Sequence, residues 1–310
     1  MPQRIVIGAN AHVELCALLA AARPDLEIRS NRYTDLTADD MAWADSYIGF
    51  RRPPLPSMGN VRWVHCTGAG VDSWMYPDEL PRDIMLTRTS ESFGPRIAEW
   101  ALARALAFTQ QLLDLHDAQR KRHWAPRDTV MLHGSRVLIV GTGDVGTHVA
   151  RLFLGLGCHV TGVSRTGYGD DAVFAHRATI DALPTLVANA EWIVLTVPLT
   201  NGTRGLFSRD LLARCRGAVL LNAGRGAVVE ESALPEALEK GWLRGAALDV
   251  FEVEPLPDPS PLWEDPRVMV SPHISGLTTT EGAVVGFLEC LAAIERGETP
   301  KWVVDRERGY

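Results

Sequence analysis

Histidine, arginine and carboxylate side chains stand in three short loops, each directly after an apolar run. His273 lies in VSPHISG, residues 270–276, and Arg225 lies between two glycines in NAGRG. Asp249 and Glu254 occupy the third loop, LDVFEVEPLP. An imidazole exchanges a proton near neutral pH, and the planar donor fork of arginine suits a carboxylate or a carbonyl oxygen. A lone histidine is mostly a structural residue, so this chemistry requires that the three loops meet.

The elements that could bring these loops together are short apolar runs separated by segments of helical periodicity. This alternation is typical of βα units around a parallel sheet, and it falls into two series. The first series holds IVIG near residue 5, LEIR near 26, YIGF near 47, VRWVH near 61 and IMLT near 84; the second holds RVLIV at 136, HVTGV at 159, WIVLTV at 192, GAVLLN at 217, GAALDV at 245 and RVMV at 267. The second series has six predicted strands, as in a complete doubly wound nucleotide fold, whose strands end at one ligand crevice. We therefore expect Arg225, the two carboxylates and His273, which follow its last three strands, to share that crevice.

The two series predict an α/β protein of two Rossmann-like or flavodoxin-like domains with parallel sheets, and an active site in the cleft between them. We expect a discontinuous substrate domain of residues 1–94 plus 280–310, because the last helical segment is most simply packed back on the first series. Residues 95–279 then form the dinucleotide-binding domain. A long helical stretch from residue 95 to 120 has one apolar side, and we expect it to mediate a homodimer.

A glycine loop opens the second series. In RVLIVGTGDVG, Gly141, Gly143 and Gly146 follow a predicted strand at GxGxxG spacing, and a predicted helix comes next. In this context the three glycines are expected to permit the tight turn, the approach of a pyrophosphate and close packing of helix on strand, respectively. The helix N-terminus would face the anion with unpaired N–H groups.

The end of the next predicted strand indicates which dinucleotide is bound. A carboxylate there would hydrogen-bond a free ribose 2′-hydroxyl, but the chain has Ser164 and Arg165. Serine can donate a hydrogen bond and arginine can make charge-assisted bonds to phosphate oxygens. We therefore expect NADP(H) in preference to NAD(H).

Composition narrows the class of protein. The 310 residues are 46% hydrophobic and 22% charged, as in a soluble globular protein, and the net charge of −7 argues against nucleic acid or an anionic membrane as partner. The five cysteines are scattered, with no spacing typical of a metal site, which predicts reduced thiols, no metal and a cytoplasmic protein.

Five motifs in order carry a family resemblance. GTGDVG, VPLT at 197–200, NAGRG, ALDVFEVEPLP and SPHIS resemble the D-isomer-specific 2-hydroxyacid dehydrogenases over roughly residues 95–280. TGAGVD at 67–72 is similar to the loop that binds the substrate carboxylate in that family. With the Ser-Arg pair, this loop looks most like the NADPH-dependent glyoxylate and hydroxypyruvate reductases.

The resemblance implies a role for each matching residue. His273 would be the general acid and base at the keto or hydroxyl oxygen, paired with Glu254, and Arg225 would bind the substrate carboxylate or the keto oxygen. Backbone N–H groups of Ala69 and Gly70 would complete the carboxylate site. The implied cofactor-binding residues are Gly141, Gly143, Asp144, Val145, Gly146, Ser164, Arg165, Thr166, Val197, Pro198, Thr203, Ala223, Asp249, which would hold the nicotinamide carboxamide, and Ser275. The substrate would be a small 2-keto or 2-hydroxy acid.

Other readings remain open beside this one. The family also contains dinucleotide-sensing corepressors on the same fold, so a catalytically weak scaffold is the alternative. Enzymes that act on formate have glutamine where this chain has Glu254. The wall around the substrate side chain is the least determined part, with Arg51, Arg52, Trp74 and Trp124 as candidates.

Overall fold

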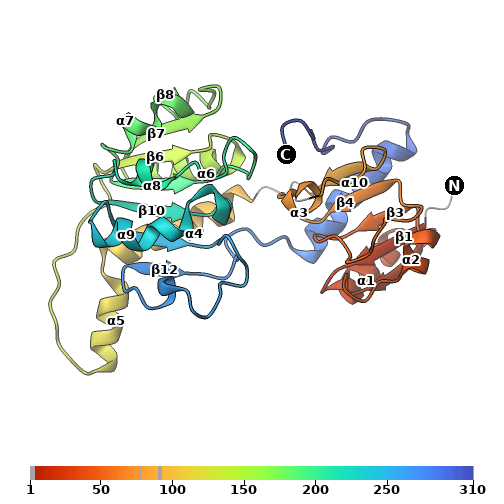
Figure 1. The fold of residues 1–310 in the computed structure, drawn as a ribbon, viewed down its shortest axis with the longest axis horizontal. Helices are drawn as coiled ribbons and strands as arrows, with labels where there is room; N and C mark the ends of the chain where they lie inside the picture. The colour runs from red at the N-terminus through yellow and green to blue at the C-terminus, as the bar shows by residue number, and fades with distance from the viewer. Residues whose placement is uncertain (1–3, 77, 90–92, 310) are drawn as a thin grey trace. The chain divides into compact units, whose positions relative to one another are not determined.

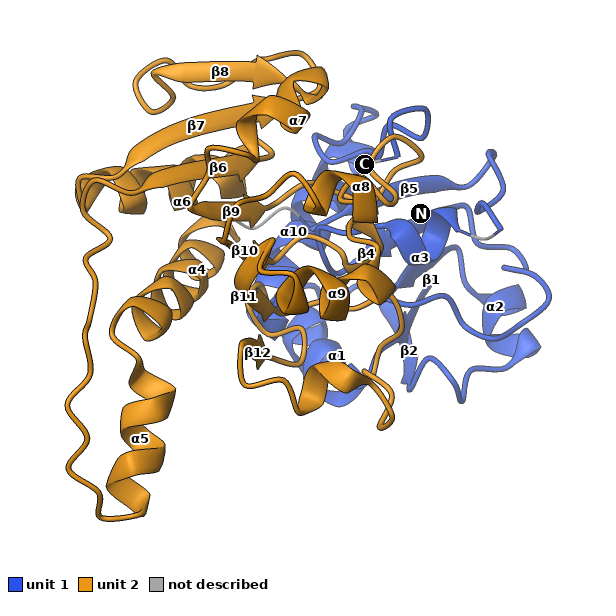
Figure 2. Ribbon diagram, turned by 60° about the vertical axis from the view of Figure 1, so that its left-hand side comes forward, with its two compact units in different colours: residues 1–91, 277–310 blue, residues 92–276 orange. Residues whose placement is uncertain are grey.

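The computed structural model describes residues 4–76, 78–89 and 93–309, and Figure 1 labels most of their helices and strands. The chain forms two compact units (Figure 2): unit 1 comprises residues 1–91 and 277–310, and unit 2 comprises residues 92–276. Each unit is built on its own parallel sheet.

Unit 1 contains a five-stranded parallel sheet in the order β2-β1-β3-β4-β5, which is the flavodoxin-like order. The predicted strands of the first series are all present, as β1 (Arg4–Gly8), β2 (Glu27–Asn31), β3 (Ser46–Ile48), β4 (Trp63–Cys66) and β5 (Met85–Arg88). The helices are α1 (His12–Ala22), α2 (Ala38–Trp43), α3 (Asp72–Met75) and α10 (Thr280–Glu295). α10 packs beside α1, and Phe287 stacks on Trp63 of β4 with ring centroids 4.7 Å apart.

Unit 2 contains a seven-stranded parallel sheet in the order β12-β11-β10-β9-β6-β7-β8. Its strands are β6 (Arg136–Val140), β7 (His159–Ser164), β8 (His176–Thr179), β9 (Trp192–Leu195), β10 (Ala218–Asn222), β11 (Leu243–Leu248) and β12 (Val268–Val270). The order reverses between β6 and β9, and ligands of doubly wound folds bind at such a switch point.

The six predicted strands of this series are confirmed, but their number is wrong because β8 was missed. Its sequence, HRAT, is largely exposed at the edge of the sheet, so it lacks the apolar run that signals a buried strand. It joins the sheet through its backbone pairing with β7.

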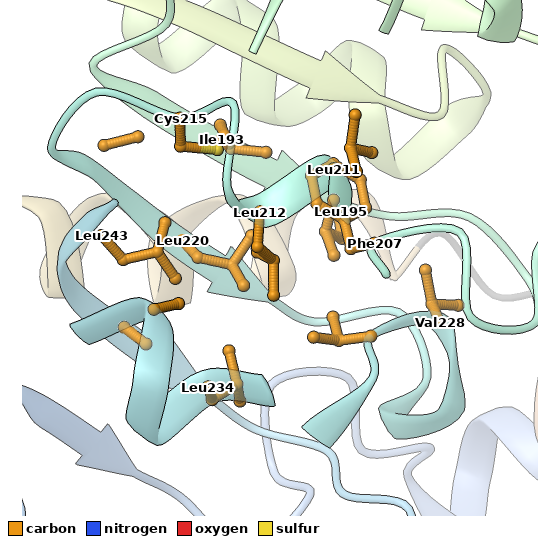
Figure 3. Close-up of a cluster of buried hydrophobic side chains, with 14 of the residues drawn as sticks. Ile193, Leu195, Phe207, Leu211, Leu212, Cys215, Leu220, Val228, Leu234 and Leu243 are labelled. Carbon is orange, nitrogen blue, oxygen red and sulfur yellow. The ribbon is translucent and has the colours of Figure 1, made fainter. Parts of the chain in front are cut away.

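The core of unit 2 explains why its strands read as apolar runs. Alternate residues of a strand face opposite sides of a sheet. On one face, side chains from β9, β10 and β11 meet those of short helices in a single cluster (Figure 3) that includes Ile193, Leu220 and Leu212. The helices of unit 2 are α4 (Gly94–Thr109), α5 (Leu112–Arg120), α6 (Asp144–Gly155), α7 (Leu183–Leu186), α8 (Arg209–Leu212) and α9 (Leu234–Glu239), with 3₁₀ turns η1 (Ile180–Ala182), η2 (Gly226–Val228), η3 (Glu231–Ala233) and η4 (Pro261–Trp263).

The expected single helix from residue 95 to 120 is wrong, because the chain breaks between α4 and α5. Gln111 has a left-handed backbone (φ 51°). The side-chain amides of Gln110 and Gln111 donate to the carbonyl oxygens of Val130 and Asp128, at 3.2 and 2.6 Å. The segment that returns from α5 therefore holds the break in place, and helical periodicity carries no signal for such a distant contact.

Among the described residues, no helix is both long and apolar enough to cross a membrane. The five cysteines have free thiols, as their spacing predicts.

Candidate active site

Two glycines of the loop between β6 and α6 are required by the chain itself. Gly141 has φ 111°, and a Cβ there would lie 2.6 Å from Oγ1 of Thr196. A Cβ on Gly146 would lie 1.7 Å from the carbonyl oxygen of Gly141, so this glycine lets α6 pack closely on the end of β6. Thr196, which the sequence analysis did not single out, donates to the same carbonyl at 3.0 Å and joins the loop after β9 to the glycine loop.

Gly143, in contrast, is not required by the protein's own packing. Its backbone is extended (φ −76°, ψ −160°), and a Cβ would meet no protein atom within 4 Å. It precedes α6, whose N-terminus receives no side-chain cap. The first-turn N–H groups and the helix dipole of such a helix attract an anion, so the loop fits a dinucleotide pyrophosphate. Asp144 is turned to His148, with Oδ1 and Nδ1 3.4 Å apart.

The loop after β7 contains Ser164, whose hydroxyl donates to the carbonyl oxygen of Tyr168 at 2.9 Å and so closes this loop. Its expected contact with a cofactor phosphate stays a prediction. Arg165 and Thr166 are exposed beside it. Within the described residues Arg165 has no hydrogen-bond or ion-pair partner.

The acidic residues of the same loop are already paired. Asp170 accepts from Arg151 at 3.1 Å, and Asp171 forms an ion pair with Arg177. Neither carboxylate of this loop therefore neutralises the positive charge of Arg165. The end of β7 is thus suited to bind an anionic group.

The loop after β9 contains Val197, Pro198 and Thr203. The Thr203 side chain is buried; its hydroxyl donates to the carbonyl oxygen of Pro198 at 2.6 Å and accepts from the N–H of Thr200 at 2.8 Å. Thr203 thus shapes the loop through its hydroxyl, and its expected place beside the cofactor stays a prediction. Val197 is also buried, with 8% of its surface exposed.

Arg225 projects from a loop with little freedom. The buried Asn222 at the end of β10 donates to the carbonyl oxygen of Arg225 at 3.1 Å and accepts from the N–H of Gly224 at 3.1 Å. A Cβ on Gly226 would lie 1.9 Å from the carbonyl carbon of Phe251, which explains this glycine. Asn222 was missed by the sequence analysis, although an asparagine that ends a buried strand before a glycine loop is a usable signal. Ala223, in the same loop, is nearly buried.

His273 and Glu254 form a close pair. Nδ1 of His273 lies 2.8 Å from Oε2 of Glu254, and the other carboxylate oxygen accepts from the N–H of Phe251 at 3.2 Å. Burial opposes ionisation of Glu254, but the hydrogen bond and charge of His273, with the charge of Arg225, outweigh it and lower the pKa of Glu254 below its usual value. The ring's Nε2 is then the nitrogen left for a reacting group. Unit 2 therefore brings Arg225, Glu254 and His273 together.

The backbone of His273 is strained and firmly held. Its φ of 54° lies in the left-handed region, which costs a non-glycine residue roughly 1–2 kcal/mol. Its N–H donates to the carbonyl oxygen of Asp249 at 2.8 Å, and the N–H groups of Ile274 and Ser275 donate to the Asp249 carboxylate at 3.1 and 2.8 Å. Asp249 is fully buried behind the loop. Both carboxylate oxygens of Asp249 thus already accept hydrogen bonds from the chain. Its expected contact with the nicotinamide carboxamide, and the expected cofactor contact of Ser275, stay predictions.

In unit 1, the loop after β4 contains Ala69 and Gly70. Arg88 donates to the carbonyl oxygen of Ala69 at 2.9 Å, and the thiol of Cys66 lies 3.4 Å from the carbonyl oxygen of Gly70. Arg88 and Cys66 thus contact the carbonyl oxygens of this loop and not its N–H groups. Trp74, a candidate for the substrate wall, is instead fully buried in the core of unit 1.

In the part of the chain that the structure describes, no group of three or more His, Cys, Asp or Glu side chains could hold a metal ion. The polar side chains that the structure brings together at the ends of the strands of unit 2 are those of Arg225, Glu254 and His273.

Comparison with known proteins identifies the family. Residues 102–275 match the family model of the D-isomer specific 2-hydroxyacid dehydrogenase NAD binding domain. Glyoxylate/hydroxypyruvate reductase A from Klebsiella pneumoniae is 34% identical over 289 residues, which are 90% of this chain and 92% of the relative.

Two solved structures resemble the whole chain. One is a D-isomer specific 2-hydroxyacid dehydrogenase from Xanthobacter autotrophicus Py2 in complex with NADPH and MES, which is 32% identical with a TM-score of 0.87 and covers 100% of each chain. The other is an NADPH-dependent glyoxylate/hydroxypyruvate reductase from Sinorhizobium meliloti in complex with NADP and sulfate; it is 27% identical with a TM-score of 0.88, and the match covers 99% of this chain and 100% of the other.

Proposed function

The chain belongs to the D-isomer specific 2-hydroxyacid dehydrogenase family, and we propose that it is an NADPH-dependent reductase of small 2-keto acids such as glyoxylate or hydroxypyruvate. The observation that carries this proposal is the 2.8 Å pair of His273 and Glu254 beside Arg225. The three residues follow β10, β11 and β12, which belong to the same parallel sheet as β6, the strand before the glycine loop.

His273 is the proton donor in this proposal. A nicotinamide cofactor, when bound at the glycine loop, would supply the hydride that the keto carbon receives. Nε2 of His273 gives its proton to the keto oxygen, and in the reverse direction it takes the proton back. Glu254 holds Nδ1 and stabilises the positive charge of the ring while the proton is bound. Positioned general acids of this kind contribute typically ~10²–10⁴ in rate.

Arg225 orients the substrate. Its guanidinium can form two parallel hydrogen bonds with the substrate carboxylate, or it can polarise the keto oxygen. The Arg225 side chain is half-buried. Its Nη1 group donates to the carbonyl oxygen of Gly224 at 2.8 Å, which fixes the guanidinium against its own loop. We extend the proposal to the N–H groups of Ala69 and Gly70, which would bind the substrate carboxylate.

The preference for NADPH rests on the end of β7. No carboxylate stands at Ser164 or Arg165, and the nearby Asp170 and Asp171 are held by arginines. Arg165 and Thr166 are the exposed groups that would contact a 2′-phosphate. Both solved structures named above were obtained with NADPH or NADP, which supports the same preference here.

A homodimer is proposed from the exposed apolar surface of α5 and of the segment after it. No residue of α5 is buried. The exposed apolar side chains are Leu112, Leu113, Leu115, Trp124, Val130 and Met131. A helix with this surface gains stability when a second copy covers it.

The function is tested with the wild-type enzyme and His273→Asn. Loss of NADPH absorbance is followed with glyoxylate, hydroxypyruvate, pyruvate and an aromatic 2-keto acid. We expect turnover of the small substrates, and a loss of roughly 10² or more in kcat in the variant because no side chain there can give a proton. NADPH binding, followed by fluorescence, serves as the control for folding. Near wild-type turnover in a folded His273→Asn protein would contradict the general-acid role.

The cofactor preference is tested with Arg165→Ala. Loss of a charge-assisted contact to the 2′-phosphate is expected to weaken NADPH binding by roughly tenfold or more and to leave NADH binding unchanged. Arg216→Ala, at an exposed arginine in the turn between α8 and β10, is the matched control. Equal effects of Arg165→Ala on the two cofactors would show that the 2′-phosphate is bound elsewhere.

The dimer is tested by measuring the mass in solution at micromolar concentration with light scattering. We expect twice the 34.0 kDa of one chain. Leu113→Asp is expected to give monomers, whereas Val13→Asp, at an exposed position of α1, is expected to leave the dimer intact. A wild-type protein that is monomeric under these conditions refutes the proposal.

A further inference from the structure

A buried series of hydrogen bonds runs from α4 to the loop of His273. Nε1 of Trp100 donates to Oγ of Ser271 at 3.0 Å, and Oγ of Ser271 donates to Oδ1 of Asp249 at 2.5 Å. The three residues are between 0 and 6% exposed. An indole N–H can only donate and an ionised carboxylate can only accept, so the hydroxyl between them has one possible orientation.

The Asp249 end of this series organises the segment that contains His273. Its carboxylate accepts from the hydroxyl of Ser271 and from the N–H groups of Ile274 and Ser275, and its carbonyl oxygen accepts from the N–H of His273. All these donors lie within residues 271–275. The left-handed backbone of His273 is therefore enclosed by bonds to one buried residue.

A positive charge lies next to this series. Arg104 follows Trp100 by one turn of α4, and its guanidinium carbon lies 4.9 Å from the centroid of the Trp100 ring. Burial lowers the pKa of Arg104, and the charge of Asp249 opposes that effect. The charge of Arg104 in turn stabilises the buried carboxylate, so α4 supports the His273 loop through a hydrogen bond and through a charge.

We propose that Ser271 is a positioning residue for the reaction: its hydroxyl, held by Trp100, orients Asp249 and thereby keeps the backbone of His273 in the conformation that directs the imidazole to Glu254. Ser271 is 4% exposed, so it acts through His273 and not on the substrate. This inference rests on the proposed function, in which His273 gives the proton. Under this proposal α4, which is far from the His273 loop in sequence, also affects the rate of keto acid reduction.

The test begins with Ser271→Ala and Ser271→Thr. Without the hydroxyl, the carboxylate loses a donor and Nε1 of Trp100 loses its acceptor, so the His273 loop is expected to relax. Small misplacements of a reacting group have large effects, and we expect kcat for glyoxylate to fall roughly tenfold or more in Ser271→Ala. The dissociation constant of NADPH should stay at the wild-type value. Threonine keeps the hydroxyl and is expected to restore turnover.

Two further variants separate positioning from loss of stability. Ser46→Ala removes a buried hydroxyl from β3 in unit 1 and should leave kcat unchanged. Trp100→Phe keeps an aromatic ring in the core but removes the N–H donor, and it should lower kcat in the same direction as Ser271→Ala. Because both substitutions interrupt one series, the double variant is expected to be no slower than Ser271→Ala alone.

Wild-type turnover in Ser271→Ala would overturn the inference, and so would fully additive losses in the double variant. Failure of the proposed function is a different result, since the wild-type enzyme would then reduce no 2-keto acid and bind NADPH unproductively. The wild-type assay is therefore completed before the variants are compared.

Discussion

The parallel order of the seven-stranded sheet is the constraint on which the site depends. Every strand of unit 2 runs in the same direction, so the loops that follow β6, β7, β9, β10, β11 and β12 all emerge at one edge. The glycine loop, Arg225, Glu254 and His273 are far apart in sequence and lie in four of these loops. Buried, branched side chains on both faces hold the strands in register, and the polar chemistry is confined to their ends.

At that edge the loops approach one another so closely that several positions have room only for glycine. Gly141, Gly224 and Gly226 each stand where a Cβ would collide with a neighbouring loop, so each loop limits the position of the next. Buried polar residues complete the arrangement: Asn222 holds the loop of Arg225, and Asp249 holds the loop of His273. Their polar groups are used by the protein itself, whereas the side chains of Arg225 and His273 are half-exposed.

The sequence allowed prediction of what depends on local pattern. Each of the eleven apolar runs contains a strand, and the central strands are apolar because they are buried on both faces, whereas the polar edge strand β8 had no such signal. The break at Gln110 and Gln111 depends on carbonyl groups about twenty residues away, which periodicity does not record. The positions of Ser164 and Asp249 were predictable from the strand ends, and that of Thr203 only from the family resemblance, but the partners of all three were not predictable. A hydroxyl or carboxylate bonds to whichever group the folded chain brings near it.

We propose that His273, held by Glu254, gives the proton during keto acid reduction. This role is tested by the single-turnover oxidation of bound NADPH by glyoxylate in Glu254→Gln, compared with the wild type, with NADPH affinity measured in parallel. The amide of glutamine cannot stabilise a positively charged ring as the carboxylate does, so we expect the rate constant to fall at least roughly tenfold while NADPH affinity is unchanged. An unchanged rate constant would refute the proposed role of the pair, because the 2.8 Å contact would then be structural only.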